Sequence, residues 1–384
     1  MIDDKSILPQ EALKGAIDIH SKYVKEWLHP DKIKPNVVGV GVGNKHRGGQ
    51  PTGEPALVFL VTHKINEEIS EDARIPHDWS GIPTDVLAVG HPFAGLGVLP
   101  VVGGLASVDG VSALPSPERR PFPAAGVGTL PLGGVSLAPP SVEAQLLARR
   151  IRPAQGGWSV GHFRITAGTI ATCVYDLLPG AMVSPPVYGL GIPPKYYILS
   201  NNHVLANSNE GRPGDPILQP GPLDGGVDPS DRIATLSRFI PIQFAPQIPI
   251  ERHHNLVDAA IAEGQFHDLD RSIYWTGPVR GWMKKQDVKV GLTVKKTGRT
   301  TNLTLGRIAV TNATIDVGYE GGRTARFTDQ IVTTAMSNPG DSGSLIVDAM
   351  DNQAVGLLFA GSSIATIVNQ FENVRSLLRV EVWP

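Results

Sequence analysis

The sequence predicts a mainly β protein, in which a small α+β domain precedes a larger β-barrel domain. One observation is a helical periodicity near the start of the chain, where apolar residues recur on one face of residues 11–28. Another is a series of short apolar segments in the later part, separated by loops rich in turn residues. At 384 residues and 41% hydrophobic, the chain is long enough to bury cores in two domains.

The first predicted domain, residues 1–110, is an accessory domain with a helix and three strands. Its helix ends before His29-Pro30, and a second, short helix is expected at 65–73. The strands are predicted at 36–43, 56–62 and 84–89. Glycines alternate along the first strand, at Gly39, Gly41 and Gly43, without the spacing of a dinucleotide-binding loop. They predict close backbone packing, and no cofactor is expected.

Residues 111–150 are predicted to form a linker. This stretch is rich in Pro, Gly, Ala and Ser, and a short helix is expected at its end, over 142–150. The second domain then covers residues 151–384, with a strand near 168–175. Cys173, the only cysteine, lies in this strand. It has no partner for an internal disulfide, and an apolar strand favours a buried thiol.

Composition and charge exclude several classes of function. The chain has 34 basic and 36 acidic residues and no basic cluster interleaved with aromatics, so no nucleic-acid partner is expected. The first residues lack the pattern of a secretory signal, and no apolar run approaches the roughly 20 residues that span a bilayer. A cytoplasmic protein without membrane contact is therefore predicted. Neither the aspartates of loop 211–231 nor His253 and His254 have metal-ligand spacing, so no metal is predicted.

The tetrapeptide Gly340-Asp341-Ser342-Gly343 indicates a serine nucleophile. A serine hydroxyl needs a neighbouring base to take its proton and backbone donors to hold the oxyanion. Gly340 lets the chain turn so that its own N–H and that of Ser342 point to one spot, and Gly343 leaves room beside the hydroxyl. Gly340 and Ser342 are therefore the candidate oxyanion-hole donors.

The candidate base and acid lie upstream of the serine. His203 follows the aromatic and aliphatic strand 196–199, and Asp258 is the one carboxylate in the apolar stretch 255–262. An ionised carboxylate is buried only with a partner, which the Nδ1–H of His203 would supply. His162 is a weaker candidate for the base and is expected to be structural. The rival acids lie in a loop predicted to be solvated: Asp224, Asp228 and Asp231.

The order His, Asp, Ser matches the arrangement of chymotrypsin-like enzymes rather than that of subtilisins or α/β-hydrolases. Asp258 follows His203 by 55 positions and Ser342 follows Asp258 by 84, so each gap has room for several barrel strands. From about Gly156 to Pro384 the chain resembles the chymotrypsin-like (trypsin-like) serine peptidases, particularly disulfide-free bacterial members. The motifs that carry the resemblance are Asn202-His203-Val204, the segment 257–262, Lys296-Thr297-Gly298-Arg299-Thr300-Thr301, and the segment 340–344. The layout also resembles the peptidase region of the plant narrow-leaf proteins.

The resemblance implies a double β-barrel catalytic domain and a serine endopeptidase of the trypsin-like type, acting through an acyl-enzyme on a polypeptide substrate. Met336, six residues before the nucleophile, would lie at the base of the specificity pocket, and Gly361 would keep its entrance open. An uncharged pocket predicts cleavage after a small or medium apolar residue. Activity without obligatory zymogen cleavage is expected. The alternatives are a latent peptide-binding module on a peptidase fold and an oligomeric scaffold, and assembly into a homo-oligomer stays open.

Overall fold

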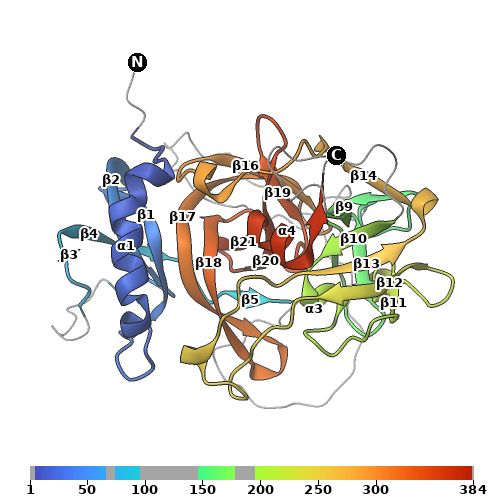
Figure 1. Ribbon diagram of the computed structural model, residues 1–384, viewed down its shortest axis with the longest axis horizontal. Coiled ribbons are helices and arrows are strands. Elements are labelled where there is room, and N and C mark those ends of the chain that lie inside the picture. Colours follow the sequence, from blue (N-terminus) through green and yellow to red (C-terminus); the bar gives the residue numbers. More distant parts are fainter. Residues whose placement is uncertain (1–4, 66–73, 96–145, 178–194, 383–384) are drawn as a thin grey trace, which may run out of the picture. The chain divides into compact units, whose positions relative to one another are not determined.

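The computed structural model describes residues 5–65, 74–95, 146–177 and 195–382. Residues 1–97 and 139–384 form one compact unit, which contains all of these described residues. Strands dominate it (Figure 1), as the sequence predicts. Residues 66–73 of the predicted helix 65–73 lie outside the described residues. Of the linker and its predicted helix 142–150, only 146–150 are described, and 147–149 form a turn and bend rather than a helix. None of the helices in the described ranges is long and apolar enough to cross a membrane.

The N-terminal elements are a helix and a small group of strands. The helix α1 (Gln10–Trp27) lies against the strands β1 and β2 (Figure 1), with Trp27 packed on Phe59. β1 is antiparallel to β2, and β2 is parallel to β4. The bounds are Val37–Arg47 for β1, Gln50–Val61 for β2, Asp78–Trp79 for β3 and Ile82–Ala88 for β4. The predicted helix and three strands of this region are confirmed.

The C-terminal strands close into a barrel. In the sheet order they run β16-β19-β20-β21-β18-β17, and β16 also pairs with β17, which completes the ring. Its interior is apolar, with Val294, Ile346 and Val368 fully buried. The bounds are Thr293–Gly298 for β16, Asn302–Tyr319 for β17, Thr324–Thr334 for β18, Leu345–Asp348 for β19, Ala354–Gly361 for β20 and Ala365–Gln370 for β21.

A second sheet curls into the other barrel, in the order β22-β9-β10-β13-β12-β11-β7-β8. Only two residues separate β8 from β9 along the chain, which brings the two ends of the sheet together. The bounds are Ser159–His162 for β7, Gly168–Thr169 for β8, Thr172–Asp176 for β9, Tyr196–Ser200 for β10, Pro216–Leu218 for β11, Arg232–Phe239 for β12, Ala260–Gly264 for β13 and Val380–Glu381 for β22. Cys173 is buried in β9, as predicted.

The remaining elements of the described residues are a small sheet, two short helices and one short strand. A three-stranded sheet pairs β15 with β14 and β14 with β6. The short helix α3 follows β10, and α4 follows β21. The bounds are Ala154–Gly156 for β6, Leu269–Ile273 for β14, Gly277–Pro278 for β15, Asn202–Leu205 for α3, Phe371–Leu378 for α4 and Phe93–Ala94 for β5.

The N-terminal strands continue the sheet of the C-terminal barrel, because β1 pairs antiparallel with β17. The predicted close packing of the alternating glycines is confirmed here: a Cβ on Gly39 would lie 2.5 Å from the carbonyl oxygen of Thr314, and one on Gly41 2.4 Å from Val310. The division at residues 110 and 150 falls largely outside the described residues and stays a prediction. Within the described residues, both predicted domains contribute strands to one sheet.

Candidate active site

The loop around Ser342 is built on two glycines in the left-handed region of φ. Gly340 has φ +99° and Gly343 has φ +96°, which other residues rarely adopt. A Cβ on Gly343 would lie 2.0 Å from Ser200 Oγ and 2.3 Å from the carbonyl oxygen of Thr169. The loop therefore packs directly on β8 and on the end of β10, the strand that leads to His203.

His203 and Asp258 form a buried pair. His203 Nδ1 lies 2.6 Å from Asp258 Oδ2, and the backbone N–H of His203 donates to Asp258 Oδ1 at 3.1 Å. Asp258 is fully buried and the side chain of His203 is 7% exposed. A carboxylate that accepts from Nδ1 leaves Nε2 of the same ring to accept a proton. His203 Nε2 is buried and has no hydrogen-bond partner.

Tyr319, which the sequence analysis did not select, also contacts the acid. Its O–H donates to Asp258 Oδ2 at 2.8 Å, and its ring meets the His203 ring edge-on at 6.1 Å between centroids. Burial raises the pKa of Tyr319 well above its usual value, and the neighbouring carboxylate adds to this shift. Tyr319 therefore stays neutral and acts as a donor. It lies at the end of the long strand β17, so no nearby motif marks it.

Two asparagines fix the backbone on either side of the carboxylate. Asn201 donates from Nδ2 to the carbonyl oxygen of Asp258 at 2.8 Å, and the N–H of Asp258 donates to Asn369 Oδ1 at 2.9 Å. All three residues are buried. The side chain of Asn201 therefore ties the histidine segment to the acid segment.

The serine loop and the histidine helix α3 meet across β8. The N–H of Thr169 donates to the carbonyl oxygen of Ser342 at 2.8 Å. A Cβ on Gly168 would lie 2.5 Å from Val204, the neighbour of His203, and 2.9 Å from the carbonyl oxygen of Ser342. Gly168 thus permits the close approach of the two segments. The structure thus pairs His203 with Asp258 and packs the Ser342 loop next to the helix that holds His203, with Ser342 7% exposed.

Two backbone donors in this loop are free. Among the described residues, neither the N–H of Gly340 nor that of Ser342 donates a hydrogen bond to the protein. The loop is held instead through the side chain of Asp341, whose oxygens accept from Thr300 N at 2.8 Å, Thr301 Oγ1 at 2.6 Å and Asn338 N at 3.0 Å. Unpaired donors at a tight turn beside a nucleophile are the arrangement that stabilises an oxyanion.

A buried lysine neutralises Asp341. Lys296 Nζ lies 3.4 Å from Asp341 Oδ2, and both side chains are fully buried. Lys296 also donates to Thr301 Oγ1 and to the carbonyl oxygen of Asn302. Burial lowers the pKa of Lys296, and the Asp341 carboxylate opposes this shift. The segment 295–304 is thus both the predicted turn between barrel strands and a support of the nucleophile loop.

Two barrels decide the architecture: one carries His203 and Asp258, the other carries the Ser342 loop, and the two meet at β8, where Thr169 donates to the carbonyl oxygen of Ser342. The fold is chymotrypsin-like. This chymotrypsin-like fold confirms the predicted fold class for the barrel region. No family model matches the sequence, and no curated protein matches it.

Solved structures of serine proteases are similar to this chymotrypsin-like fold. A Nocardiopsis protease is 16% identical with a TM-score of 0.40, over 60% of this chain and 98% of its own. Thermobifida fusca protease A is 16% identical with a TM-score of 0.39, over 59% and 96%. A Cellulomonas bogoriensis chymotrypsin is 19% identical with a TM-score of 0.37, over 59% and 96%. The fold assignment rests on the strand pairing of the two barrels.

The two predicted pocket residues lie on adjoining elements of the second barrel. Met336 is buried, its carbonyl oxygen accepts from Thr304 Oγ1 at 2.7 Å, and its side chain packs in the apolar interior. Gly361 ends β20, where an added Cβ would lie 3.2 Å from Ser337 Oγ. Ser337 Oγ is hydrogen-bonded to Thr366 Oγ1 at 2.8 Å. The side chains of Ser337 and Thr366 beside Gly361 therefore present neutral hydroxyls, not charged groups.

One expectation about the rival residues is wrong. Asp224 is not solvated: its side chain is 6% exposed and forms an ion pair with Arg299. It also accepts from Ser159 Oγ at 2.5 Å. Glycines and prolines around it indicated an exposed turn, whereas the partner Arg299 lies far along the chain. His162 is structural, as expected, since its Nε2 lies 3.0 Å from Asp215 Oδ2.

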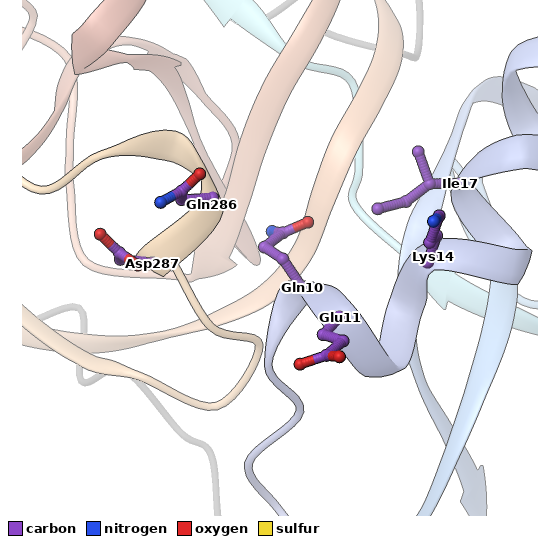
Figure 2. Close-up of a pocket in the computed structure, with 6 residues that line it drawn as sticks. All are labelled: Gln10, Glu11, Lys14, Ile17, Gln286 and Asp287. Atoms are coloured by element: carbon purple, nitrogen blue, oxygen red, sulfur yellow. The ribbon is translucent and has the colours of Figure 1, made fainter.

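A hollow elsewhere on the molecule shows no catalytic chemistry. Figure 2 shows it between α1 and the 3-10 turn Lys285–Asp287. Gln10 lies at the edge of this hollow, where its Nε2 donates to the carbonyl oxygen of Val288 at 2.9 Å. The lining carries no nucleophile or histidine and consists of Gln10, Glu11, Lys14, Ile17, Gln286 and Asp287. No group of three or more metal-ligating side chains occurs in the part of the chain that the structure describes.

Proposed function

We propose that this chain is a serine endopeptidase that uses His203, Asp258 and Ser342. The observation that carries the proposal is the 2.6 Å contact between His203 Nδ1 and Asp258 Oδ2, buried beside the Ser342 loop. Ser342 attacks the peptide carbonyl while His203 Nε2 takes its proton. Asp258 fixes the tautomer and stabilises the imidazolium. His203 then gives the proton to the leaving amine, the peptide C–N bond breaks and an acyl-enzyme forms. Water, with His203 again as the base, hydrolyses the acyl-enzyme and restores the Ser342 hydroxyl.

The remaining parts of the site have roles in the same mechanism. The free N–H groups of Gly340 and Ser342 stabilise the oxyanion, and Asp341 holds them in place through Thr300 and Thr301. Tyr319 is a positioning residue that orients the Asp258 carboxylate. A polypeptide substrate pairs with the edge of β20, and the neutral surroundings of Gly361 favour a small or medium apolar side chain before the scissile bond.

Labelling with an alkyl fluorophosphonate, read by intact mass, tests this proposal. One adduct is expected on the folded protein and none on Ser342→Ala or His203→Ala. Asp258→Asn should keep the fold and lower the labelling rate by orders of magnitude, about 10⁴-fold at the upper end. Equal labelling of wild type and Asp258→Asn would contradict the assignment of the acid, and absence of any adduct would contradict the proposed activity.

A second candidate is a latent peptide-binding module on the same fold. The observation that favours it is the missing hydrogen bond at His203 Nε2, since an engaged base would contact the serine hydroxyl. This candidate predicts that Ser342→Ala binds extended peptides while the wild type neither cleaves them nor reacts with the fluorophosphonate.

A further inference from the structure

The edge of β20 beside the nucleophile is already occupied by the chain itself. β21 pairs with one edge of β20, at Gly361 through Thr366. The other edge pairs first with β19, as far as Leu357. It then passes the nucleophile loop, where the N–H of Gly343 donates to the carbonyl oxygen of Leu358 at 2.8 Å. Three residues later, at Gly361, the partner is Phe93 of β5.

The direction of β5 is that of a bound peptide. β5 runs antiparallel to β20, so that Phe93 lies at Gly361 and the residues after it lie toward the nucleophile loop. A peptide whose scissile carbonyl lies at Ser342 would place the residues before that bond along the same edge. The backbone groups of β20 that such a peptide needs at Gly361 are therefore engaged by Phe93.

Contacts on the outer side hold this segment in place. β5 pairs in parallel with the end of β17, and Ala94 lies opposite Tyr319, the residue that donates to Asp258. The N–H of Gly318 donates to the carbonyl oxygen of Pro92 at 3.0 Å. Ala94 is 1% exposed and packs in the apolar cluster that includes Tyr319 and Phe359. Figure 1 shows β5, in cyan, reaching toward the part of the molecule that holds β20 and α3.

The segment is also anchored at its start. Ser362 Oγ, directly after β20, donates to the carbonyl oxygen of Val89 at 2.6 Å. Gly90 has φ +69°, and a Cβ there would lie 2.8 Å from the same Ser362 Oγ. The chain thus turns sharply at Gly90 onto the edge of β20. Any larger residue at position 90 would displace Ser362.

We infer that residues 89–95 are an internal competitor, which occupies the binding positions for the residues that precede the scissile bond. This inference rests on the proposed function, because it concerns regulation of the same site. A peptide substrate gains full access only when the segment leaves the edge of β20. The apparent affinity for such a substrate is then its intrinsic affinity multiplied by the fraction of molecules with the segment displaced.

Ala94→Asp tests the inference, because an aspartate side chain has no room or partner at a fully packed position. Ala12→Asp is the matched control, since Ala12 is exposed on α1. Two probes are compared: an alkyl fluorophosphonate, which needs only the nucleophile, and an Ala-Ala-Ala phosphonate ester, which also needs the edge of β20. We expect Ala94→Asp to raise the ratio of the peptide phosphonate rate to the fluorophosphonate rate by at least about tenfold; because Ala94 packs beside Tyr319, the fluorophosphonate rate corrects for any change at Asp258. Equal rate ratios in wild type, Ala94→Asp and Ala12→Asp would overturn the inference.

Phe93→Ala is the milder second variant if Ala94→Asp does not fold by circular dichroism. It removes the ring that packs against Gly318, and it should shift the ratio in the same direction by about threefold. Phe266→Ala, at a 52% exposed phenylalanine, is its control.

If neither probe labels any variant, the proposed activity fails and binding decides the inference. A synthetic peptide of residues 89–95 is then titrated into Ser342→Ala with and without Ala94→Asp. Binding only in the presence of Ala94→Asp upholds the internal competitor, and equal binding to both proteins rejects it.

Discussion

The buried ion pair beneath the nucleophile loop makes Lys296 the most informative position for mutagenesis. Lys296→Met keeps most of the side-chain volume and removes the cation, so the Asp341 carboxylate remains buried without a counter-charge. Removal of one partner of a buried ion pair destabilises a protein by about 3–5 kcal/mol. Asp341 retains the donors of Thr300, Thr301 and Asn338, so we expect the lower end, about 3 kcal/mol.

The same change should impair the site more than it impairs the rest of the fold. Asp341 holds the turn that aims the N–H groups of Gly340 and Ser342, and loss of one oxyanion donor lowers turnover by about 10²–10³-fold. Urea unfolding gives the stability, and the rate of fluorophosphonate labelling of the folded protein reports the loop. Lys295→Met is the matched control, because Lys295 is the adjacent, half-buried residue. It should lose no more than about 1 kcal/mol.

A double variant separates the charge from the packing. In Lys296→Met/Asp341→Asn both charges are gone, and we expect it to recover at least about 2 kcal/mol relative to Lys296→Met. A single variant as stable as wild type, or a double variant no better than the single one, would refute the view that an unpaired carboxylate is the source of the destabilisation.

Three further changes test other contacts. Tyr319→Phe removes the donor to Asp258 without altering the packing, and labelling of the serine should slow by about tenfold, measured with the fluorophosphonate. His20→Gln tests the buried histidine of α1, whose pKa burial lowers from 6.5 to about 4. Because the unfolded chain binds this proton below pH 6.5 and the folded one does not, stability should fall by about 3 kcal/mol between pH 6.5 and 4. The variant should lack that fall in urea titrations. Gly343→Ala should lose at least about 2 kcal/mol and all labelling, because its Cβ would overlap the neighbouring strand.

Each of these predictions has a contrary outcome. An unchanged labelling rate in Tyr319→Phe would remove Tyr319 from the positioning of Asp258. A pH dependence retained in His20→Gln would assign the acid sensitivity to other groups, and His267→Gln, at a 79% exposed side chain, provides the baseline. A Gly343→Ala protein of wild-type stability would contradict the described packing of the loop on β8.

Local patterns predicted the parts of this structure that depend on local chemistry. The periodicity of residues 11–28 gave α1, and the alternating glycines of residues 39–43 gave a tightly packed strand. Ser342, His203 and Asp258 could be identified from local sequence. Ser342 lies in a Gly-Asp-Ser-Gly turn, His203 directly follows an apolar strand, and Asp258 is the one carboxylate in an apolar stretch. Their catalytic roles stay a prediction; the structure pairs His203 with Asp258 and packs the Ser342 loop next to the helix that holds His203.

Contacts between residues that lie far apart in the sequence could not be predicted in this way. Tyr319 lies 61 positions from Asp258, and Lys296 reaches Asp341 because β16 pairs with β19, the strand that follows the Ser342 loop. Asp224 was misassigned for this reason, since turn residues surround it and its partner Arg299 is 75 positions away. The pairing of Phe93 with Gly361 depends on the same kind of contact, between strands that no motif connects.

The pairing of β1 with β17 has a practical consequence for any shortened form of the protein. Removal of the first 95 residues would open the hydrogen-bonding edge of β17 over residues 310–315, where β1 now pairs, and would uncover Val310 and Ala313, which the glycines of β1 now cover. Long exposed edges recruit strands from other molecules. A truncated chain should therefore aggregate, and its oligomeric state would reflect this artificial edge instead of the behaviour of the intact protein.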